Sequence, residues 1–329
     1  MNVDPRSVSD VSALRASVEA ALASVVPRRA PADLYDPYRY VMAGEGKRLR
    51  PVLLLLAAEA CGVPAVEAMP AALATEVFHN FTLVHDDIMD RASTRRGRDT
   101  VHVRWDEPTA ILAGDLMMGE SYGLLAQTRA GDLRVLLEAW GEMVRRLCEG
   151  QMEDMRFATD PNVSVERYLR MIDGKTGALV ALCFEAGAIL AGADADTRRH
   201  LHDAGIETGR AFQILDDLLD LTADDVAWGK TVGGDLVEGK RAYLLLRALE
   251  TTTGDDRAFF QAIADRPGLD PDAIPDARAR MEAAGVLDDA RGAVAHHTAA
   301  ALACLAALPP SDARDGLAAL VRDMAGRGR

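Results

Sequence analysis

Two stretches of this chain, residues 66–90 and 195–221, carry apolar residues around much of their helical circumference, and each ends in the acidic pattern Asp-Asp-x-x-Asp. A helix that is apolar on most sides is usually surrounded by other helices. The longest apolar runs, such as residues 51–60, fall well short of the roughly 20 residues that a membrane span requires. These features predict a soluble bundle of helices around a central cavity.

The rest of the chain also has the apolar spacing of helices, and it shows no alternating pattern long enough to indicate strands. Aromatic residues make up only 5% of the chain, while alanine and aliphatic residues dominate, which favours helix over strand. We therefore expect an all-α protein. Besides the two stretches above, the predicted helical segments are 7–26, 51–61, 109–128, 133–157, 164–191, 241–251, 272–284, 286–306 and 311–325.

Four segments rich in Gly, Pro, Asp and basic residues separate predicted helices and are expected to be loops. They are residues 43–51, 93–100, 157–164 and 225–240. Composition does not shift along the chain and no low-complexity linker interrupts it, so we expect a single domain over residues 1–329. The acidic segment TTTGDDR, residues 251–257, is the most disorder-prone part of that domain.

The charge balance argues against a nucleic-acid partner. With 37 basic and 51 acidic residues the formal net charge is −14, whereas phosphate backbones select basic surfaces. The first ten residues lack the basic-then-apolar pattern of a signal peptide. We expect a cytoplasmic protein with buried thiols rather than disulfides, because the four cysteines are scattered and form no Cys-x-x-Cys pair: Cys61, Cys148, Cys183 and Cys304.

The spacing of the first acidic cluster brings its carboxylates together. On a helix, Asp86 and Asp90 lie one turn apart, roughly 6 Å, on one face, and Asp87 lies about 100° around the axis. Asp216, Asp217 and Asp220 repeat this arrangement. A cluster that simply faces water at a helix end is one interpretation. However, carboxylates at a helix C-terminus oppose the helix dipole, and burying them unpaired is costly, so a compensating cation is expected.

Magnesium is the cation that these clusters fit best. Clusters with oxygen ligands alone, without His or Cys, suit Mg²⁺, which takes one or two carboxylates and commonly completes its shell with water and phosphate oxygens. Two such clusters facing each other would bind a diphosphate through magnesium. Basic residues beside glycines in the predicted loops would hold the rest of that diphosphate. They are Lys47, Arg48, Arg50, Arg95, Arg96, Lys175, Lys230 and Lys240.

An ordered set of motifs between residues 40 and 250 resembles the trans-isoprenyl diphosphate synthases, also called polyprenyl synthetases. The motifs are GEGKRLRP, EVFHNFTLVHDDIMDRASTRRG, GDLM, GQMED, MIDGKTGAL, GRAFQILDDLLD and GKTVGGDLVEGK. One Asp-Asp-x-x-Asp is a weak signal, but the order and spacing of the whole set are specific. The resemblance implies the all-α isoprenoid synthase fold, Mg²⁺ as cofactor with three ions when diphosphate is bound, and a homodimer.

The resemblance also implies roles for individual residues. Asp86, Asp90 and Asp216 would bind Mg²⁺ directly, and Asp87, Asp217 and Asp220 would complete the acidic walls partly through water. The residues matching the site for the allylic diphosphate are Arg95, Lys175, Thr176, Gln213, Lys230 and Lys240. Those matching the pocket for isopentenyl diphosphate are Lys47, Arg50, His79 and Arg96. The residues expected to take part in catalysis are Asp86, Asp87, Asp90, Arg95, Lys175, Asp216, Asp217 and Lys230.

The implied reaction is the head-to-tail condensation of isopentenyl diphosphate with dimethylallyl, geranyl or farnesyl diphosphate. Mg²⁺ and the basic side chains would stabilise charge on the leaving diphosphate, and apolar helices would exclude water. Two alternatives remain open. A class I terpene cyclase shares the fold and the first cluster, although its second metal motif usually mixes Asn or Asp, Ser or Thr, and Glu. The chain could also be a non-catalytic subunit of a heteromeric synthase.

Three positions depart from the family pattern. Glu45 stands where a glycine is frequent, which is tolerable if residue 45 does not need a positive φ. Ala242 and Leu244 stand where a threonine and a proline are common. The missing hydroxyl could loosen the loop that presents Lys240.

Product length in this family depends on bulky residues on the helix below the first aspartates. Along the helix axis from Asp86, Phe81 lies roughly 7.5 Å away and Phe78 roughly 12 Å away. The small Thr82 lies between Phe81 and the aspartate cluster. Both phenylalanines could instead be ordinary core residues. A single aromatic five residues before the cluster, with no insertion inside DDIMD, resembles synthases that make geranylgeranyl diphosphate. We expect a product of twenty carbons, with farnesyl diphosphate as the next choice.

Overall fold

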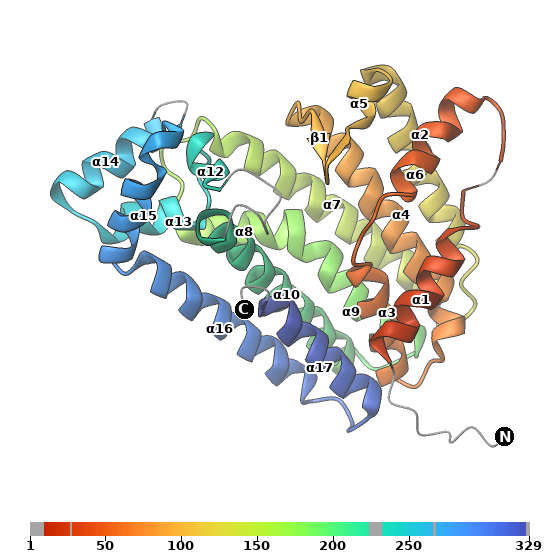
Figure 1. The fold of residues 1–329 in the computed structure, drawn as a ribbon. Helices are drawn as coiled ribbons and strands as arrows, with labels where there is room; N and C mark the ends of the chain where they lie inside the picture. The colour runs from red at the N-terminus through yellow and green to blue at the C-terminus, as the bar shows by residue number, and fades with distance from the viewer. Residues whose placement is uncertain (1–9, 27, 224–231, 266–267, 327–329) are drawn as a thin grey trace. The chain divides into compact units, whose positions relative to one another are not determined.

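The computed structural model of the protein describes residues 10–26, 28–223, 232–265 and 268–326, and these residues are predominantly helical (Figure 1). The all-α prediction is confirmed. The α-helices are α1 (Val11–Leu22), α2 (Ala32–Met42), α3 (Leu49–Ala60), α4 (Ala65–Met89), α5 (Val101–Arg104), α6 (Glu107–Leu125), α7 (Leu133–Phe157), α8 (Val165–Ile172), α9 (Ala178–Leu190), α10 (Ala195–Thr222), α12 (Gly234–Val237), α13 (Tyr243–Thr251), α14 (Gly254–Asp265), α15 (Ile274–Ala283), α16 (Val286–Leu305) and α17 (Asp312–Ala325).

The described residues fall into two compact units. The first unit comprises the described residues within 1–139, 182–202 and 305–320, and the second comprises those within 140–181, 203–304 and 321–329. Helices α7, α9, α10 and α17 contribute residues to both units, and α16 contributes its last residue, Leu305, to the first. The expectation of a single domain over the whole chain stays a prediction.

Helix α4 is the centre of the first unit, where it runs alongside α3 and α6 (Figure 1). This packing explains the apolar run of α3, because Leu53, Leu54, Leu55 and Leu56 are all fully buried. A helix buried on every side needs such a run. The first unit therefore encloses the long helix that carries the first aspartate cluster.

One basic residue of the predicted loop at 43–51 is structural. The Arg48 side chain is buried, and its guanidinium bonds Glu76 of α4 and Glu19 of α1, each at 2.8 Å, and the carbonyl of Gly44 at 2.8 Å. These bonds hold the pKa of Arg48 above its ordinary value even though burial acts in the opposite direction. Arg48 thus joins α1, α3 and α4 through a buried guanidinium.

The core of the second unit gathers residues from α8, α10 and α13–α16. Ile214 of α10, Leu245 of α13, Phe260 of α14 and Met281 of α15 are almost fully buried in it. Helix α10, which carries the second aspartate cluster, is therefore supported by the helices that follow it in the chain.

The structure differs from the sequence-based expectations in several places, which include the short helices α5 and α12. Helix α2 was not predicted. The segment 251–257 is ordered, because it ends α13 and begins α14, whose first turn carries Asp255 and Asp256 as the helix dipole favours. The loop at 93–100 contains a two-stranded hairpin, β1 (Thr94–Arg95) and β2 (Arg98–Asp99). The predicted helix 164–191 is interrupted by a π-helical turn, η1, at Asp173–Gly177.

Candidate active site

Helix α4 ends directly after the first aspartate cluster. Asp90 caps the helix, the amide of Ala92 donates to the carbonyl of Asp87 at 2.9 Å, and the amide of Arg91 donates to that of Ile88 at 3.2 Å. This is the Schellman arrangement, which usually has glycine at the left-handed position; here Arg91 takes it, with φ 51°. The turn sends the chain away from the helix axis immediately beyond Asp90.

The hairpin after this turn supplies the basic partner of the cluster. Its strands are joined by Arg96 and Gly97, both with positive φ (52° and 71°), as a two-residue hairpin turn requires. The Nε of Arg95 donates to Oδ1 of Asp87 at 2.6 Å, and its Nη2 lies 3.8 Å from Oδ2 of Asp86. Burial raises the pKa of Asp87, and the charge of Arg95 opposes that rise.

Asp217 is the matching residue of the second cluster, and it too is buried. Its Oδ2 accepts from the Tyr168 hydroxyl at 2.6 Å and from the Tyr243 amide at 2.9 Å, and its Oδ1 accepts from Gln213 at 3.1 Å. Burial raises the pKa of Asp217 to about 7, with a smaller contribution from the charge of Asp235, while the three hydrogen bonds act against the rise. Protein donors therefore already occupy this carboxylate.

The two clusters share one pattern of exposure. The second aspartate of each is buried, with 5% of Asp87 and 6% of Asp217 exposed, whereas Asp86 and Asp216 are partly exposed. The last aspartate is exposed at position 90 and partly exposed at 220, where Oδ2 accepts from the amide of Asp235 at 3.1 Å. The first and last aspartates are thus the members that a metal ion can reach, and their oxygen-only chemistry fits Mg²⁺.

Within the described ranges, no group of three or more His, Cys, Asp and Glu side chains is close enough to form a metal site by itself. The first cluster belongs to the first unit and the second cluster to the second. That the two face a common cavity stays a prediction.

His79 and Arg50 form a polar pair in the first unit. The Nη1 of Arg50 lies 3.0 Å from Nε2 of His79. Burial, together with the charges of Arg50, Arg96 and Arg95, holds the pKa of His79 well below its usual range. A neutral His79 can accept a hydrogen bond from Arg50 through Nε2 and so orient the guanidinium.

Arg96 and Lys47 are the other two residues expected at this place. Arg96 donates to the carbonyl of Glu45 at 2.5 Å, and burial followed by the neighbouring arginine charges keeps its pKa below the ordinary value. Glu45 does not adopt a positive φ, so the departure from glycine at this position is tolerated. A Cβ on Gly46 would lie 3.1 Å from Nη1 of Arg96 and 3.2 Å from Nη1 of Arg48. Gly46 therefore leaves room for both guanidinium groups.

The aromatic residues below the first cluster contact one another edge to face. Phe78 is fully buried, and its ring centroid lies 5.1 Å from that of Phe81, which in turn lies 4.8 Å from the ring of His85. The hydroxyl of Thr82 donates to the carbonyl of His79 at 2.8 Å. A Cβ on Gly114 of α6 would lie 2.3 Å from Nε2 of His85, so this glycine of the GDLM motif makes room for the histidine ring.

The π-helical turn η1 carries Lys175 and Thr176. Lys175 pairs with Asp154 of α7 at 2.5 Å, and Thr176 donates to Oε1 of Gln213 on α10 at 3.2 Å. Because Gln213 also donates to Asp217, a continuous chain of hydrogen bonds runs from Thr176 to the second cluster. Thr176, Gln213 and Asp217 were predicted separately, and the structure brings them together.

Close backbone contacts at glycines hold this turn against its neighbours. A Cβ on Gly150 of α7 would lie 2.2 Å from the amide nitrogen of Lys175, and one on Gly174 would lie 2.5 Å from the carbonyl of Arg146. On the other side, a Cβ on Gly209 of α10 would lie 2.8 Å from Cα of Gly177. Only glycine allows these approaches. The glycines of GQMED and MIDGKTGAL therefore set the distance between Lys175 and both long helices.

Lys240 lies on a loop that is anchored by its neighbours. Lys240 is exposed, and its Nζ lies 4.0 Å from Asp235. Arg241 is buried and donates to the carbonyls of Phe157 at 2.8 Å and Ala264 at 2.9 Å. The expected loosening of this loop by Ala242 is therefore offset by the guanidinium of Arg241. Lys230 lies outside the described residues.

Several partners in this site carried no usable signal in the sequence. Asp154 lies in the GQMED motif, but the sequence does not show that it pairs with Lys175. Tyr168, Tyr243 and Arg241 were not singled out, because nothing in a local pattern shows that a residue dozens of positions away will meet an aspartate or a carbonyl.

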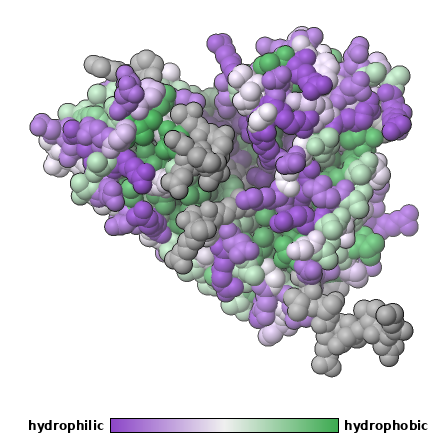
Figure 2. Space-filling view, in the orientation of Figure 1, coloured by the Kyte–Doolittle hydropathy of each residue, from purple (hydrophilic) through white to green (hydrophobic). Residues whose placement is uncertain are grey.

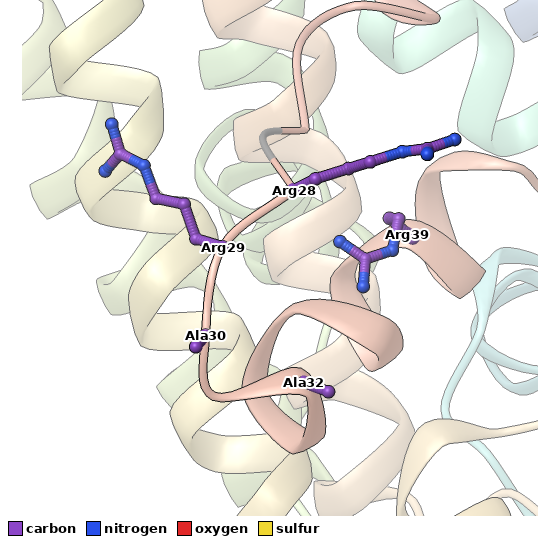
Figure 3. A pocket seen from close by; sticks show the side chains of 5 residues that line it. All are labelled: Arg28, Arg29, Ala30, Ala32 and Arg39. Atoms are coloured by element: carbon purple, nitrogen blue, oxygen red, sulfur yellow. The ribbon is translucent and has the colours of Figure 1, made fainter.

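Two further features of the surface of the described residues are a hydrophilic face and a pocket. Hydrophilic residues cover the face around β1 and α5 (Figure 2), where Arg91, Thr94 and Arg96 are exposed. A pocket of about 570 Å³ is lined by residues just before α2 and by Ala32 and Arg39 of α2, and in Figure 3 Arg29 points away from Arg28 and Arg39. Arg39 pairs with Asp36, and none of the predicted site residues lines this pocket.

No helix in the described part of the chain is both long and apolar enough for a membrane span.

Comparisons with known proteins give a consistent result. The sequence profile of the polyprenyl synthetase family matches residues 31–281. A geranylgeranyl diphosphate synthase of Methanosarcina mazei is 41% identical over 245 residues, covering 74% of this chain and 76% of that protein. A crystal structure of a geranylgeranyl pyrophosphate synthase matches with a TM-score of 0.91 at 37% identity, covering 98% of this chain and 100% of the other. A polyprenyl synthase from Caulobacter crescentus, crystallised with calcium and isoprenyl diphosphate, matches with a TM-score of 0.88 at 29% identity over 100% of both chains.

The contact between Gly150 and Lys175 can be tested by a methyl group. Gly150→Ala forces the two backbones apart and should destabilise the protein by about 1–3 kcal/mol, as overpacking commonly does. Gly141→Ala is the matched control on the same helix, because nothing lies within 4 Å of the new Cβ. There the gain in helix propensity should stabilise by about 0.5–1 kcal/mol. Urea unfolding followed by circular dichroism measures both, and equal changes in unfolding free energy would contradict the contact.

Proposed function

The chain belongs to the polyprenyl synthetase family and is a prenyltransferase, and we propose that it condenses isopentenyl diphosphate with an allylic diphosphate in a Mg²⁺-dependent, head-to-tail reaction. The observation that carries this proposal is the shared pattern of the two aspartate clusters. Each has a buried second aspartate held by the protein and flanking aspartates that a metal can reach.

We propose that Asp86, Asp90 and Asp216 bind Mg²⁺ directly and that Asp220 contributes through water. Asp87 and Asp217 act differently, by holding Arg95 and the Thr176–Gln213 chain in position. Mg²⁺ held by these aspartates would neutralise charge on the diphosphate leaving group and so lower the barrier to breaking its C–O bond. The proposed number of three ions follows from the family resemblance.

The allylic diphosphate would be held by side chains that already have partners before it binds. Arg95, Lys175 and Thr176 already have acidic or amide partners that orient them, so little reorganisation is needed when a diphosphate binds. Arginine offers a planar fork and lysine a mobile charge for phosphate oxygens. The remaining members of this proposed set are Gln213, Lys230 and Lys240.

Isopentenyl diphosphate would bind at Arg50, His79, Arg96 and Lys47. Burial, followed by the charges of nearby arginines, holds the pKa of His79 well below its usual range, so the positive charge of this site lies on groups such as arginine that bind phosphate through two bonds. In the reaction, the allylic C–O bond breaks, the double bond of isopentenyl diphosphate attacks the resulting carbon, and a proton then leaves to the released diphosphate. Apolar side chains exclude water, which would otherwise quench the cation.

A homodimer and a cytoplasmic location are further parts of the proposal. Helix α6 exposes three large apolar side chains, with Ile111 40%, Leu112 58% and Tyr122 37% exposed. Exposed apolar surface often marks contacts between protein chains. A second copy of the chain is the proposed partner for this face of α6.

The assay that tests the function uses the purified chain with Mg²⁺, isopentenyl diphosphate and, in turn, dimethylallyl, geranyl or farnesyl diphosphate. We expect an all-trans product of twenty carbons, formed only when Mg²⁺ and isopentenyl diphosphate are both present. Product formed without isopentenyl diphosphate would instead indicate a terpene cyclase. A folded chain that makes no product alone would indicate a non-catalytic subunit.

Product length should depend on Phe81, which is partly exposed below the first cluster, whereas Phe78 is fully buried beneath it. Phe81→Ala removes the proposed floor and should shift the main product from twenty carbons to twenty-five or more, as measured by chromatography of the dephosphorylated alcohols. Phe259→Ala on α14 is the control for loss of an aromatic ring and should leave product length unchanged. An unaltered distribution in Phe81→Ala would refute the assignment of the floor.

A further inference from the structure

The π-helical turn Asp173–Gly177 sits between two regular helices, α8 and α9. Such a turn contains one more residue than a regular one, so it changes the direction in which every following side chain points by about 100°. Lys175 and Thr176 lie inside the turn. Their directions toward Asp154 and Gln213 therefore depend on the π-helical turn being maintained rather than relaxing to a regular helix.

The glycine contacts around this turn fix a distance but not a rotation. Gly150, Gly174, Gly177 and Gly209 let backbones approach, yet they have no side chains that could interlock. Contacts through glycines alone do not select one rotation of a helix about its axis. The buried side chains of Ile172 before the turn and Leu179 after it restrict that rotation, and a directional contact inside the turn would fix it further.

A two-pronged ion pair at the first residue of the turn supplies that direction. Asp173 is buried, and both its oxygens are bonded by Arg210 of α10, Oδ1 by Nε at 2.6 Å and Oδ2 by Nη2 at 2.7 Å. These bonds hold the pKa of Arg210 above its ordinary value. A fork that meets a carboxylate with two parallel bonds fixes orientation as well as distance.

Arg210 is itself held by a second carboxylate. Its Nη1 donates to Glu207 at 3.0 Å, and Glu207 also bonds Nδ1 of the buried His297 of α16 at 2.6 Å. Burial opposes ionisation of Glu207, but the bond to His297 and the charges of His297 and Arg210 keep its pKa below the ordinary value. A line of charged and hydrogen-bonded groups therefore connects α16, α10 and the π-helical turn.

We infer that the Asp173–Arg210 pair is a positioning device for catalysis, which fixes the rotation of the π-helical turn so that Lys175 and Thr176 face the allylic diphosphate. This inference rests on the proposed role of those two residues. Stability alone does not explain the pair, because a buried ion pair is often no more stabilising than two apolar side chains of similar size. What the pair adds is direction.

The test removes both charges at once, so that neither is left buried without its partner. The variant is Arg210→Met with Asp173→Leu, and its control is Arg291→Met with Asp288→Leu, which removes an exposed pair on α16 of the same unit. We expect the first variant to raise the KM for the allylic diphosphate at least about fivefold, while the KM for isopentenyl diphosphate changes less than twofold. The control should change neither. KM does not depend on the fraction of active protein, so partial unfolding does not produce this split.

A second arm asks whether the pair acts through Lys175. Lys175→Ala alone should raise the allylic KM about tenfold or more, since a charge-assisted bond to phosphate is lost. In that background, removing the Asp173–Arg210 pair should add little. Additive effects would overturn the inference, and so would an unchanged allylic KM in the paired variant.

The outcome for Lys175→Ala separates the two proposals. If that variant keeps the wild-type allylic KM, the proposed role of Lys175 fails and the inference falls with it. If it raises the KM while the paired variant does not, only the positioning inference is overturned. Should the paired variant not fold, Arg210→Lys keeps the charge and loses the fork. It should give a smaller rise in allylic KM, and a wild-type value would contradict the proposal.

Discussion

Burial of one carboxylate in each aspartate cluster is the constraint on which the rest of this site depends. A buried carboxylate is tolerated only if it is paired or hydrogen-bonded. Asp87 meets this requirement with Arg95, and Asp217 meets it with Tyr168, Tyr243 and Gln213. The need to satisfy these two groups determines where the hairpin, α8 and the start of α13 must lie.

The same requirement prepares the flanking groups for substrate. Arg95 is oriented by Asp87 on a short hairpin, and Thr176 is oriented through Gln213 by Asp217. Lys175 is held by Asp154, on a turn that glycines bring close to α7. Groups that are held in place before substrate arrives do not have to be ordered during the reaction, which lowers its barrier.

Much of the fold could be predicted from the sequence because its helices are long and strongly patterned. Helix α7 has the predicted bounds, 133–157, and α10 differs from its prediction by one residue. Helix α14 was missed because the acidic residues of its first turn are typical of disordered segments. The burial of Phe260, which holds this helix in the core, is not visible in the sequence. The π-helical turn was missed because its cause is tertiary: it depends on glycines of α7 and α10 and on Arg210, none of which is adjacent in sequence.

The acidic residues of the site were found because their spacing is local. The different roles of the buried and the exposed aspartates depend on burial, which a sequence does not show.

These different roles are tested most directly by calorimetric titration of Mg²⁺ with inorganic pyrophosphate into Asp86→Asn, Asp87→Asn and the unaltered chain. Asp86→Asn should weaken binding of the metal–pyrophosphate complex by about tenfold or more at nearly unchanged stability, because a direct ligand is lost. Asp87→Asn should instead lower stability and have the smaller effect on metal binding. Equal losses of metal binding in both variants, at equal stability, would contradict the proposed roles of the two aspartates.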